Sequence, residues 1–365
     1  MGLRCGIVGL PNVGKSTLFN AISNAKAESA NYPFCTIEPN VGIITVPDER
    51  LQILEELVHP ERVLPTVIEF VDIAGLVKGA SKGEGLGNKF LANIREVDAI
   101  IHVVRCFEDP NIVHVAGKVD PISDKEIIDT ELQLKDLDSV EKKLLKVQRS
   151  AKAGDAKAKK EFASLEKYKN HLEAGLNVRS LDVTEDDKEA VADLNLLTEK
   201  PVIYAANVDE DSMNDGNEFS KTLAEHVKNE NTQVVLISAS IEAQIAELTE
   251  PEEKEMFLAE YGLKESGLNK LIRASYELLN LVTYFTAGVK EVRAWTIEKG
   301  WKAPQAAGVI HTDFEKGFIR AEVIKLADYQ EYKSEAKIKE AGKMAVEGKE
   351  YVVQDGDIMH FRFNV

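Results

Sequence analysis

Short apolar runs alternate with helical patterns along the chain. Continuous apolar segments typical of buried strands lie at Val67–Val71, Ala99–Val104, Val202–Ala205 and Val234–Ile237, and a further strand is expected at Val41–Val46. Segments with apolar residues at helical spacing separate these strands. This order predicts an α/β fold with a mostly parallel sheet covered by helices on both faces. Ligands of such sheets bind at the carboxyl ends of the strands.

Strand patterns are absent between Ser123 and Thr198, where Lys, Glu, Asp, Leu and Ala dominate. Two apolar stripes at helical spacing flank an Ala-Gly-Asp turn at Ala153–Asp155. We therefore expect an antiparallel helical arm inserted before the last strands of the sheet. The stripes consist of Leu132, Leu134, Leu137, Val140, Leu144, Leu145 and Val147, and of Phe162, Leu165, Tyr168, Leu172 and Leu176.

The pattern changes again near Leu279, where strand and turn signals predict a compact mixed domain of a helix on a small sheet. The expected elements are a hairpin of Val282–Thr286 and Val289–Thr296, a helix at Pro304–Ile310, a strand at Phe318–Ile324, and a second hairpin of Glu350–Val353 and Ile358–Phe363. The predicted domains are residues 1–122 with 199–278, residues 123–198, and residues 279–365.

Composition supports this picture and limits the partners. The 365 residues are enough for two or three domains, and the net charge of −17 argues against diffuse nucleic-acid binding over the whole surface. No apolar run is long enough for a bilayer, and no secretory leader precedes the first motif, so we expect a cytoplasmic protein without a membrane partner.

The segment from Gly9 to Ser16 fits the phosphate-loop pattern G-x-x-x-x-G-K-[ST], and it lies between a predicted strand and a predicted helix. The loop amides and the helix N-terminus suit phosphates, the Lys15 ammonium reaches the β- and γ-phosphates, and the Ser16 hydroxyl is a ligand for Mg²⁺. The sequence therefore predicts a binding site for a nucleoside triphosphate. The expected phosphate-loop contacts are Asn12, Val13, Gly14, Lys15, Ser16 and Thr17.

Two further segments complete the expected metal and γ-phosphate site. Asp72 ends a buried strand and begins Asp-Ile-Ala-Gly, in which the carboxylate suits Mg²⁺ and the Gly75 amide suits the γ-phosphate. Thr36 lies in the loop where a switch threonine closes over the metal. The glycine-rich segment Asp72–Lys89 would respond to the γ-phosphate. We expect Ser16, Thr36 and Asp72 to bind Mg²⁺.

These motifs, together with the helical insertion and the terminal small domain, resemble those of the Obg-like ATPase family, the YchF-type branch of the Obg-related P-loop NTPases. The resemblance covers essentially the whole chain. It implies a P-loop NTPase domain, a helical arm and a C-terminal ubiquitin-like β-grasp (TGS) domain. It also implies a ribosome-associated ATPase that releases ADP and phosphate and acts as a nucleotide-dependent switch in translation or the stress response.

The base-specificity loop is expected after Val202–Ala206, at Asn207-Val208-Asp209-Glu210. Guanine-specific relatives carry Asn-Lys-x-Asp there, and their Asp accepts two hydrogen bonds from guanine. Glu210 is longer and would crowd that edge, while Asn207 could contact the N6/N7 edge of adenine. We favour ATP, with Ser238 and Ala239 closing on the base. A GTPase of the same class is the alternative, and a metabolic phosphotransferase is a less favoured one.

The residues for hydrolysis are less obvious. Leu76 occupies the position where many relatives carry a water-orienting Gln. His114 follows a predicted strand at its active-site end and could orient water instead, although an ordinary loop histidine is the alternative. In related NTPases the residue equivalent to Asn12 helps to hold K⁺, so we expect K⁺ to stimulate turnover.

Basic residues cluster near the predicted tip of the arm. They are compatible with an RNA contact or with an ordinary solvated helical face, and the sequence favours neither. The resemblance adds the ribosome as the expected partner. The arm and the TGS domain are candidates for an RNA contact there, and whether the arm binds RNA or protein stays open. The cluster comprises Lys142, Lys143, Lys146, Arg149, Lys152, Lys157, Lys159 and Lys160.

Overall fold

The structure is a computed structural model that describes residues 3–24, 40–73, 86–115, 117–230 and 232–364. The chain forms two compact units. The first contains the residues up to Ile44, apart from a short interruption, and Glu69–Ala274; the second is built mainly of Thr45–Ile68 and Ser275–Val365. Within the described residues, no helix combines the length and apolar character that a membrane span requires.

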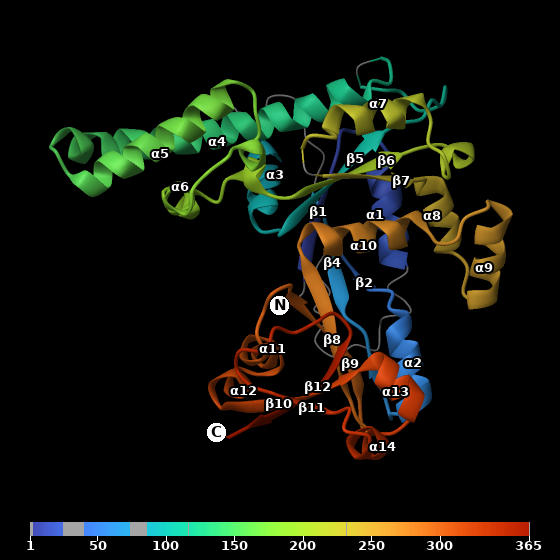
Figure 1. Cartoon of the computed structure of the whole chain (residues 1–365). Coiled ribbons are helices and arrows are strands. Elements are labelled where there is room, and N and C mark those ends of the chain that lie inside the picture. Colours follow the sequence, from blue (N-terminus) through green and yellow to red (C-terminus); the bar gives the residue numbers. More distant parts are fainter. Residues whose placement is uncertain (1–2, 25–39, 74–85, 116, 231, 365) are drawn as a thin grey trace. The chain divides into compact units, whose positions relative to one another are not determined.

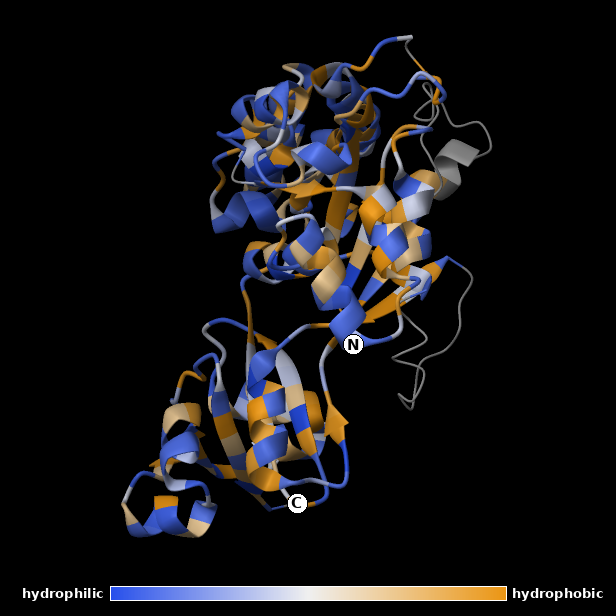
Figure 2. Cartoon of the chain, turned by 90° about the vertical axis from the view of Figure 1, so that its right-hand side faces the viewer, coloured by the Kyte–Doolittle hydropathy of each residue, from blue (hydrophilic) through white to orange (hydrophobic). Residues whose placement is uncertain are grey.

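A six-stranded sheet forms the core of the first unit, in the order β2-β4-β1-β5-β6-β7. The pairs β1–β5, β5–β6 and β6–β7 are parallel, and every residue of β5 and β6 is buried. Figure 2 shows apolar residues concentrated in these strands. The predicted mostly parallel sheet is confirmed. Its strands are β1 (Leu3–Val8), β2 (Val41–Thr45), β4 (Val67–Asp72), β5 (Ala99–Arg105), β6 (Val202–Asn207) and β7 (Gln233–Ile237).

Helices connect these strands, as parallel strands require. The helices of this part of the chain are α1 (Lys15–Asn24), α3 (Leu86–Arg95), α4 (Pro121–Lys152), α5 (Ala156–Glu173), α6 (Glu185–Glu189), α7 (Glu218–Val227), α8 (Ala239–Ile245), α9 (Pro251–Glu260) and α10 (Gly267–Leu278). Short 3₁₀ turns lie at Val178–Ser180, Ala192–Leu194, Leu197–Glu199 and Glu210–Ser212.

The arm consists of α4 and α5, which lie side by side in Figure 1. Side-chain oxygens of Asp120 and Asp155 cap the two helices, which explains where each begins. Val140, Leu165 and Tyr168, which lie between the helices, are fully buried, and other apolar residues pack around them partly buried. The predicted helical pair is therefore correct. Three residues of the predicted stripes do not belong to the buried seam, because Leu134, Leu145 and Leu176 are 47%, 69% and 48% exposed.

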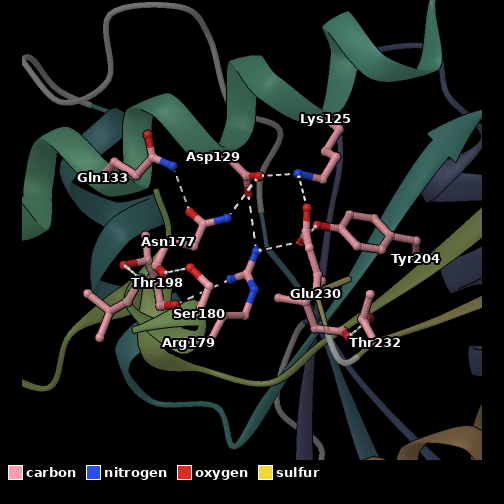
Figure 3. Close-up of polar contacts among 12 residues, drawn as sticks. Lys125, Asp129, Gln133, Asn177, Arg179, Ser180, Thr198, Tyr204, Glu230 and Thr232 are labelled. Atoms are coloured by element: carbon pink, nitrogen blue, oxygen red, sulfur yellow. Dashed lines mark hydrogen bonds and ion pairs between the residues drawn. The ribbon is translucent and has the colours of Figure 1, made fainter. Parts of the chain in front are cut away.

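A charged network joins the root of the arm to the sheet (Figure 3). The Lys125 ammonium lies 2.7 Å from an Asp129 oxygen and 2.8 Å from a Glu230 oxygen. The Arg179 guanidinium, from the segment after α5, lies 3.6 Å from each of the same carboxylates. The Tyr204 hydroxyl of β6 donates to Glu230 at 3.0 Å. Because these charges are largely removed from water and paired, the network ties the start of α4 to β6 and to the segment after α5.

The second unit contains a mixed sheet in the order β11-β10-β12-β8-β9-β3. The β8–β9 hairpin is antiparallel, β12 runs parallel to β8 and antiparallel to β10, and α11 packs against the sheet, which is the expected β-grasp arrangement. The elements are α2 (Glu49–Val58), β3 (Val63–Leu64), β8 (Leu281–Ala287), β9 (Val292–Glu298), α11 (Ala303–Ile310), α12 (Thr312–Lys316), β10 (Phe318–Lys325), α13 (Leu326–Tyr332), α14 (Glu335–Glu340), β11 (Ala345–Glu347) and β12 (Asp357–Phe363).

Two features of this unit differ from the sequence interpretation. The hairpin of Glu350–Val353 with Ile358–Phe363 is wrong: Val352 makes an isolated bridge to Lys302, and β12 pairs with β8 and β10. In addition, Thr45–Ile68 belongs to this unit, with Leu54 of α2 in its core and β3 paired with β9. Local periodicity revealed α2 but could not reveal which sheet it packs against.

A hydrogen bond to the buried carboxylate of Glu242 connects α8 to the first residue of α10, and its contribution to stability can be tested. The Glu242 carboxylate accepts this hydrogen bond from the Gly267 N–H at 2.7 Å. Burial, opposed by this hydrogen bond, raises the pKa of Glu242 from 4.5 to about 7. The folded state therefore binds the proton more tightly than the unfolded chain, and stability falls by about 3 kcal/mol as the pH rises through this interval. We expect Glu242→Gln to remove that loss, measured by urea unfolding at pH 5 and pH 8; an unchanged pH dependence would contradict it.

Candidate functional site

A cavity of about 940 Å³ lies at the carboxyl ends of β1, β5, β6 and β7, beside the N-terminus of α1. This is the edge at which the sequence places the phosphate loop and the base loop. The cavity is lined by Leu10, Pro11, Asn12, Gly14, Lys15, Ser16, Thr17, Phe107, Glu108, Asp109, Ile112, Asn207, Val208, Asp209, Glu210, Ser238, Ala239 and Ser240.

The phosphate loop between β1 and α1 needs glycine at two positions. Gly14 has φ of +93°, and a Cβ there would lie 2.2 Å from the Asn207 Nδ2 atom. A Cβ on Gly9 would lie 2.7 Å from the carbonyl oxygen of Val103. The loop is therefore packed tightly against β5 and β6, with the first turn of α1 beside the cavity. This is the arrangement that phosphate binding requires.

The structure brings together two of the residues predicted to act on the triphosphate. The Lys15 ammonium forms an ion pair with the Asp72 carboxylate at the end of β4. The Lys15 side chain is only 10% exposed, so this charge is well shielded from solvent. The hydroxyl of Ser16 and the carboxylate of Asp72 are hard oxygen ligands of the kind that Mg²⁺ prefers. Thr36 and Gly75 lie outside the described residues.

Asn207, at the end of β6, links the two halves of the site. Its Nδ2 donates to the Val13 carbonyl at 2.8 Å, and its Oδ1 accepts from the Ala239 N–H at 2.9 Å. The side chain is almost fully buried. One N–H hydrogen and one oxygen lone pair remain for a base. Asn207 thus ties the phosphate loop to the loop after β7.

The base loop continues with Val208 and Glu210. The Val208 side chain is buried and its N–H donates to the Ile237 carbonyl, which keeps this segment beside β7. The exposed Glu210 carboxylate accepts from the Ser240 hydroxyl at 3.2 Å and from the Gln244 amide at 3.4 Å. Glu210 therefore lies at the rim, facing the Ser238–Ser240 segment.

His114 is not among the residues that line the cavity. Its imidazole is buried, and its Nε2 lies 2.9 Å from Asp124 Oδ2 in the first turn of α4. Burial raises the pKa of Asp124, although the hydrogen bond from His114 opposes this shift. Ile112, two residues earlier, does line the cavity. His114 itself does not touch the cavity in this arrangement.

The loop after β5 is a wall of the site that the sequence interpretation missed. Phe107, Glu108, Asp109 and Ile112 all line the cavity. Their place after a buried strand, at the carboxyl edge of the sheet, was a usable signal. Glu108 and Asp109, with Asp209 and Glu210, give the lining four carboxylates, whereas Lys15 is the sole cation among the described lining residues.

Comparison with known proteins agrees with this geometry. A family model described as "50S ribosome-binding GTPase" matches residues 4–149, and the YchF-GTPase_C model, described as a protein of unknown function, matches residues 281–364. Proteins named "Ribosome-binding ATPase YchF" from Haemophilus ducreyi and Bacillus subtilis are 61% and 60% identical, each over the full length of both chains.

Solved structures give the same result for the fold. The Schizosaccharomyces pombe YchF GTPase superimposes with a TM-score of 0.89 at 42% identity, covering 99% of this chain and 98% of that one. A GTP-binding protein from Pyrococcus horikoshii, at 21% identity, matches with a TM-score of 0.57 over 99% of this chain and 100% of that one, and supports the fold alone.

Proposed function

Because the chain belongs to the YchF family, we propose that it binds and hydrolyses ATP in the cavity at the edge of the first sheet, and that it acts as a nucleotide-dependent switch on the ribosome. The observation that supports this proposal is that the phosphate loop and the base loop line the same cavity. The Asn207 side chain connects them through its hydrogen bonds to Val13 and Ala239. The relatives at about 60% identity are named ribosome-binding ATPases.

Calorimetry with Mg–ATP and Mg–GTP tests the base choice. Val208 stands where guanine-specific loops carry Lys, and Glu210 where they carry Asp, so the donors of guanine would be left without their usual partners. Each unanswered donor costs about 1–3 kcal/mol, which corresponds to roughly ten- to hundredfold in affinity. We expect ATP to bind at least tenfold more tightly. Tighter binding of GTP would favour the alternative, that the protein is a GTPase. One similar solved structure is named a GTPase.

Ribosome association is tested by co-sedimentation with a non-hydrolysable ATP analogue, compared with ADP. A nucleotide switch should sediment with ribosomes more in one nucleotide state than in the other. The reason is that ATP and ADP must favour different conformations of the protein, and the ribosome must bind one of these more tightly. Equal sedimentation in both states would exclude a nucleotide switch. Transfer of phosphate to an added metabolite, instead of release as free phosphate, would favour a phosphotransferase.

The negative charge of the cavity lining indicates that cations must accompany a bound triphosphate. A triphosphate adds several negative charges to a lining that holds four carboxylates and one lysine. Mg²⁺ held by Ser16 and Asp72 would supply part of the missing positive charge. We further propose that K⁺ beside Asn12 supplies more, and we expect K⁺ to raise turnover by about tenfold over Na⁺ at equal ionic strength. Equal phosphate release in the two salts would exclude this role.

The tip of the arm provides a surface for RNA. Two of its basic residues are neutralised within the arm, since Lys142 pairs with Asp138 and Lys143 with Glu161 and Asp193. The remaining six are exposed and form no ion pair among the described residues. We propose that they contact RNA phosphates on the ribosome. They are Lys146, Arg149, Lys152, Lys157, Lys159 and Lys160.

A triple variant tests this surface. If Lys146→Ala, Lys157→Ala and Lys160→Ala remove three phosphate contacts, the slope of log K against log salt for ribosome binding falls by about 2–3 units. A matched variant with Lys221→Ala and Lys228→Ala on and after α7, also exposed, should keep the slope. The same slope in all three proteins would identify the arm tip as a solvated face.

A further inference from the structure

Arg105, the last residue of β5, is 2% exposed and directs its guanidinium into the loop that follows it. Nε donates to the Phe107 carbonyl at 3.1 Å, Nη1 to the Ile112 carbonyl at 3.0 Å, and Nη2 to the Asp109 carbonyl at 3.4 Å. The guanidinium carbon lies 4.6 Å from the centroid of the Phe107 ring. One side chain therefore holds three main-chain groups of one loop.

The loop that Arg105 holds is part of the proposed ATP site. Phe107, Asp109 and Ile112, whose carbonyls accept from Arg105, all line the cavity. The carbonyl of Val113, the next residue, accepts from Asn12 Nδ2 of the phosphate loop at 3.1 Å. The shape of this wall is thus set by Arg105 on one side and by the phosphate loop on the other.

We propose that Arg105 is a positioning residue for ATP binding, which keeps the loop from Cys106 to Val113 in the shape that completes the cavity. The guanidinium is suited to this task because its donors form a rigid planar fork that reaches several carbonyls at once. Without it, the loop loses its order, and nucleotide binding has to bear the entropy of ordering it. The proposal rests on the assignment of this cavity to ATP.

A direct contact with phosphate is a different role with a different signature. The donors of Arg105 are engaged within the loop, and Arg105 itself is not among the residues that line the cavity. If Arg105 acts only by shaping the cavity wall, it stabilises bound ATP and the transition state equally. Replacing Arg105 then raises KM and leaves kcat unchanged. A residue that neutralises the developing charge would instead lower kcat.

The test compares Arg105→Lys with Tyr204→Phe. The lysine keeps the charge but cannot bridge three carbonyls, while Tyr204→Phe removes a buried hydrogen bond from the neighbouring strand, away from the cavity. We expect Arg105→Lys to raise the Kd and KM for Mg–ATP by about 10- to 30-fold with kcat within threefold, and Tyr204→Phe to change none of them beyond twofold. A lowered kcat at constant KM, unchanged values, or an equal rise of KM in both variants would overturn the proposal.

Two further measurements separate the possible failures. If Lys15→Ala retains normal ATP affinity, the cavity is not the ATP site and the proposed function fails. If Lys15→Ala loses ATP while Arg105→Lys binds normally, only the role of Arg105 fails. Should Arg105→Lys not fold, amide exchange in the unaltered protein decides. Slow exchange at Asn111 and Ile112 in the absence of ATP supports a preformed loop; exchange as fast as in an unstructured segment, with slowing only after ATP is added, overturns it.

Discussion

Replacing Lys15 with alanine is expected to weaken ATP binding by about 10²- to 10³-fold. Lys15 is the sole cation among the described lining residues, and the cavity also holds four carboxylates. The Lys15 side chain is only 10% exposed, so little solvent screens its attraction for a phosphate. Truncating one member of a desolvated pair of lysine and phosphate costs about 3–4 kcal/mol, which is equivalent to this loss of affinity.

Calorimetry with Mg–ATP measures the effect of Lys15→Ala directly. The control is Lys221→Ala, which removes an exposed lysine of α7 outside the cavity and should leave the Kd unchanged. Thermal unfolding of both variants without nucleotide shows that each is folded. ATP affinity within threefold of the unaltered protein for Lys15→Ala would mean that the phosphate loop does not bind the triphosphate here.

Replacing His114 with alanine is expected to lower kcat by about 10²-fold while the Kd for ATP stays within twofold. The reduction is the usual contribution of a general base or water-orienting group. The affinity is preserved because the imidazole does not line the cavity and is instead held by Asp124. Catalysis by His114 would therefore require a rearrangement that brings the imidazole within reach of the attacking water.

Single-turnover measurement of phosphate release separates this role from a structural one. His226→Ala is the matched control, since His226 is an exposed histidine of α7 that does not line the cavity. If His114→Ala leaves kcat unchanged, His114 is not catalytic. If it weakens ATP binding instead, His114 acts on the shape of the loop after β5.

Local chemistry was sufficient to predict much of this molecule. The buried strands β5 and β6 are continuous apolar runs, and their neighbours in sequence carry helical periodicity, so their type follows from a few adjacent residues. Asp155 both ends the turn of the arm and caps α5, which is again a local interaction. The phosphate loop was recognisable because its glycines are required by backbone geometry at fixed spacing.

Other features depend on residues that are distant in sequence. The C-terminal hairpin was predicted wrongly because Ile358–Phe363 alternates like any half-buried strand, and alternation does not identify a partner. Leu134, Leu145 and Leu176 follow the arm's helical pattern but are exposed, because the segments that pack against the arm cover only part of its surface.

The sequence by itself determined the main buried strands of the first sheet, the helical pair of the arm, and the residue chemistry suited to a triphosphate. The tertiary structure alone decided that Asn207 joins Val13 to Ala239, that His114 is held by Asp124, and that Arg105 serves three carbonyls of one loop. Periodicity and motif spacing report interactions along the chain, whereas the partner of a buried polar group is chosen by whichever distant segment folds against it.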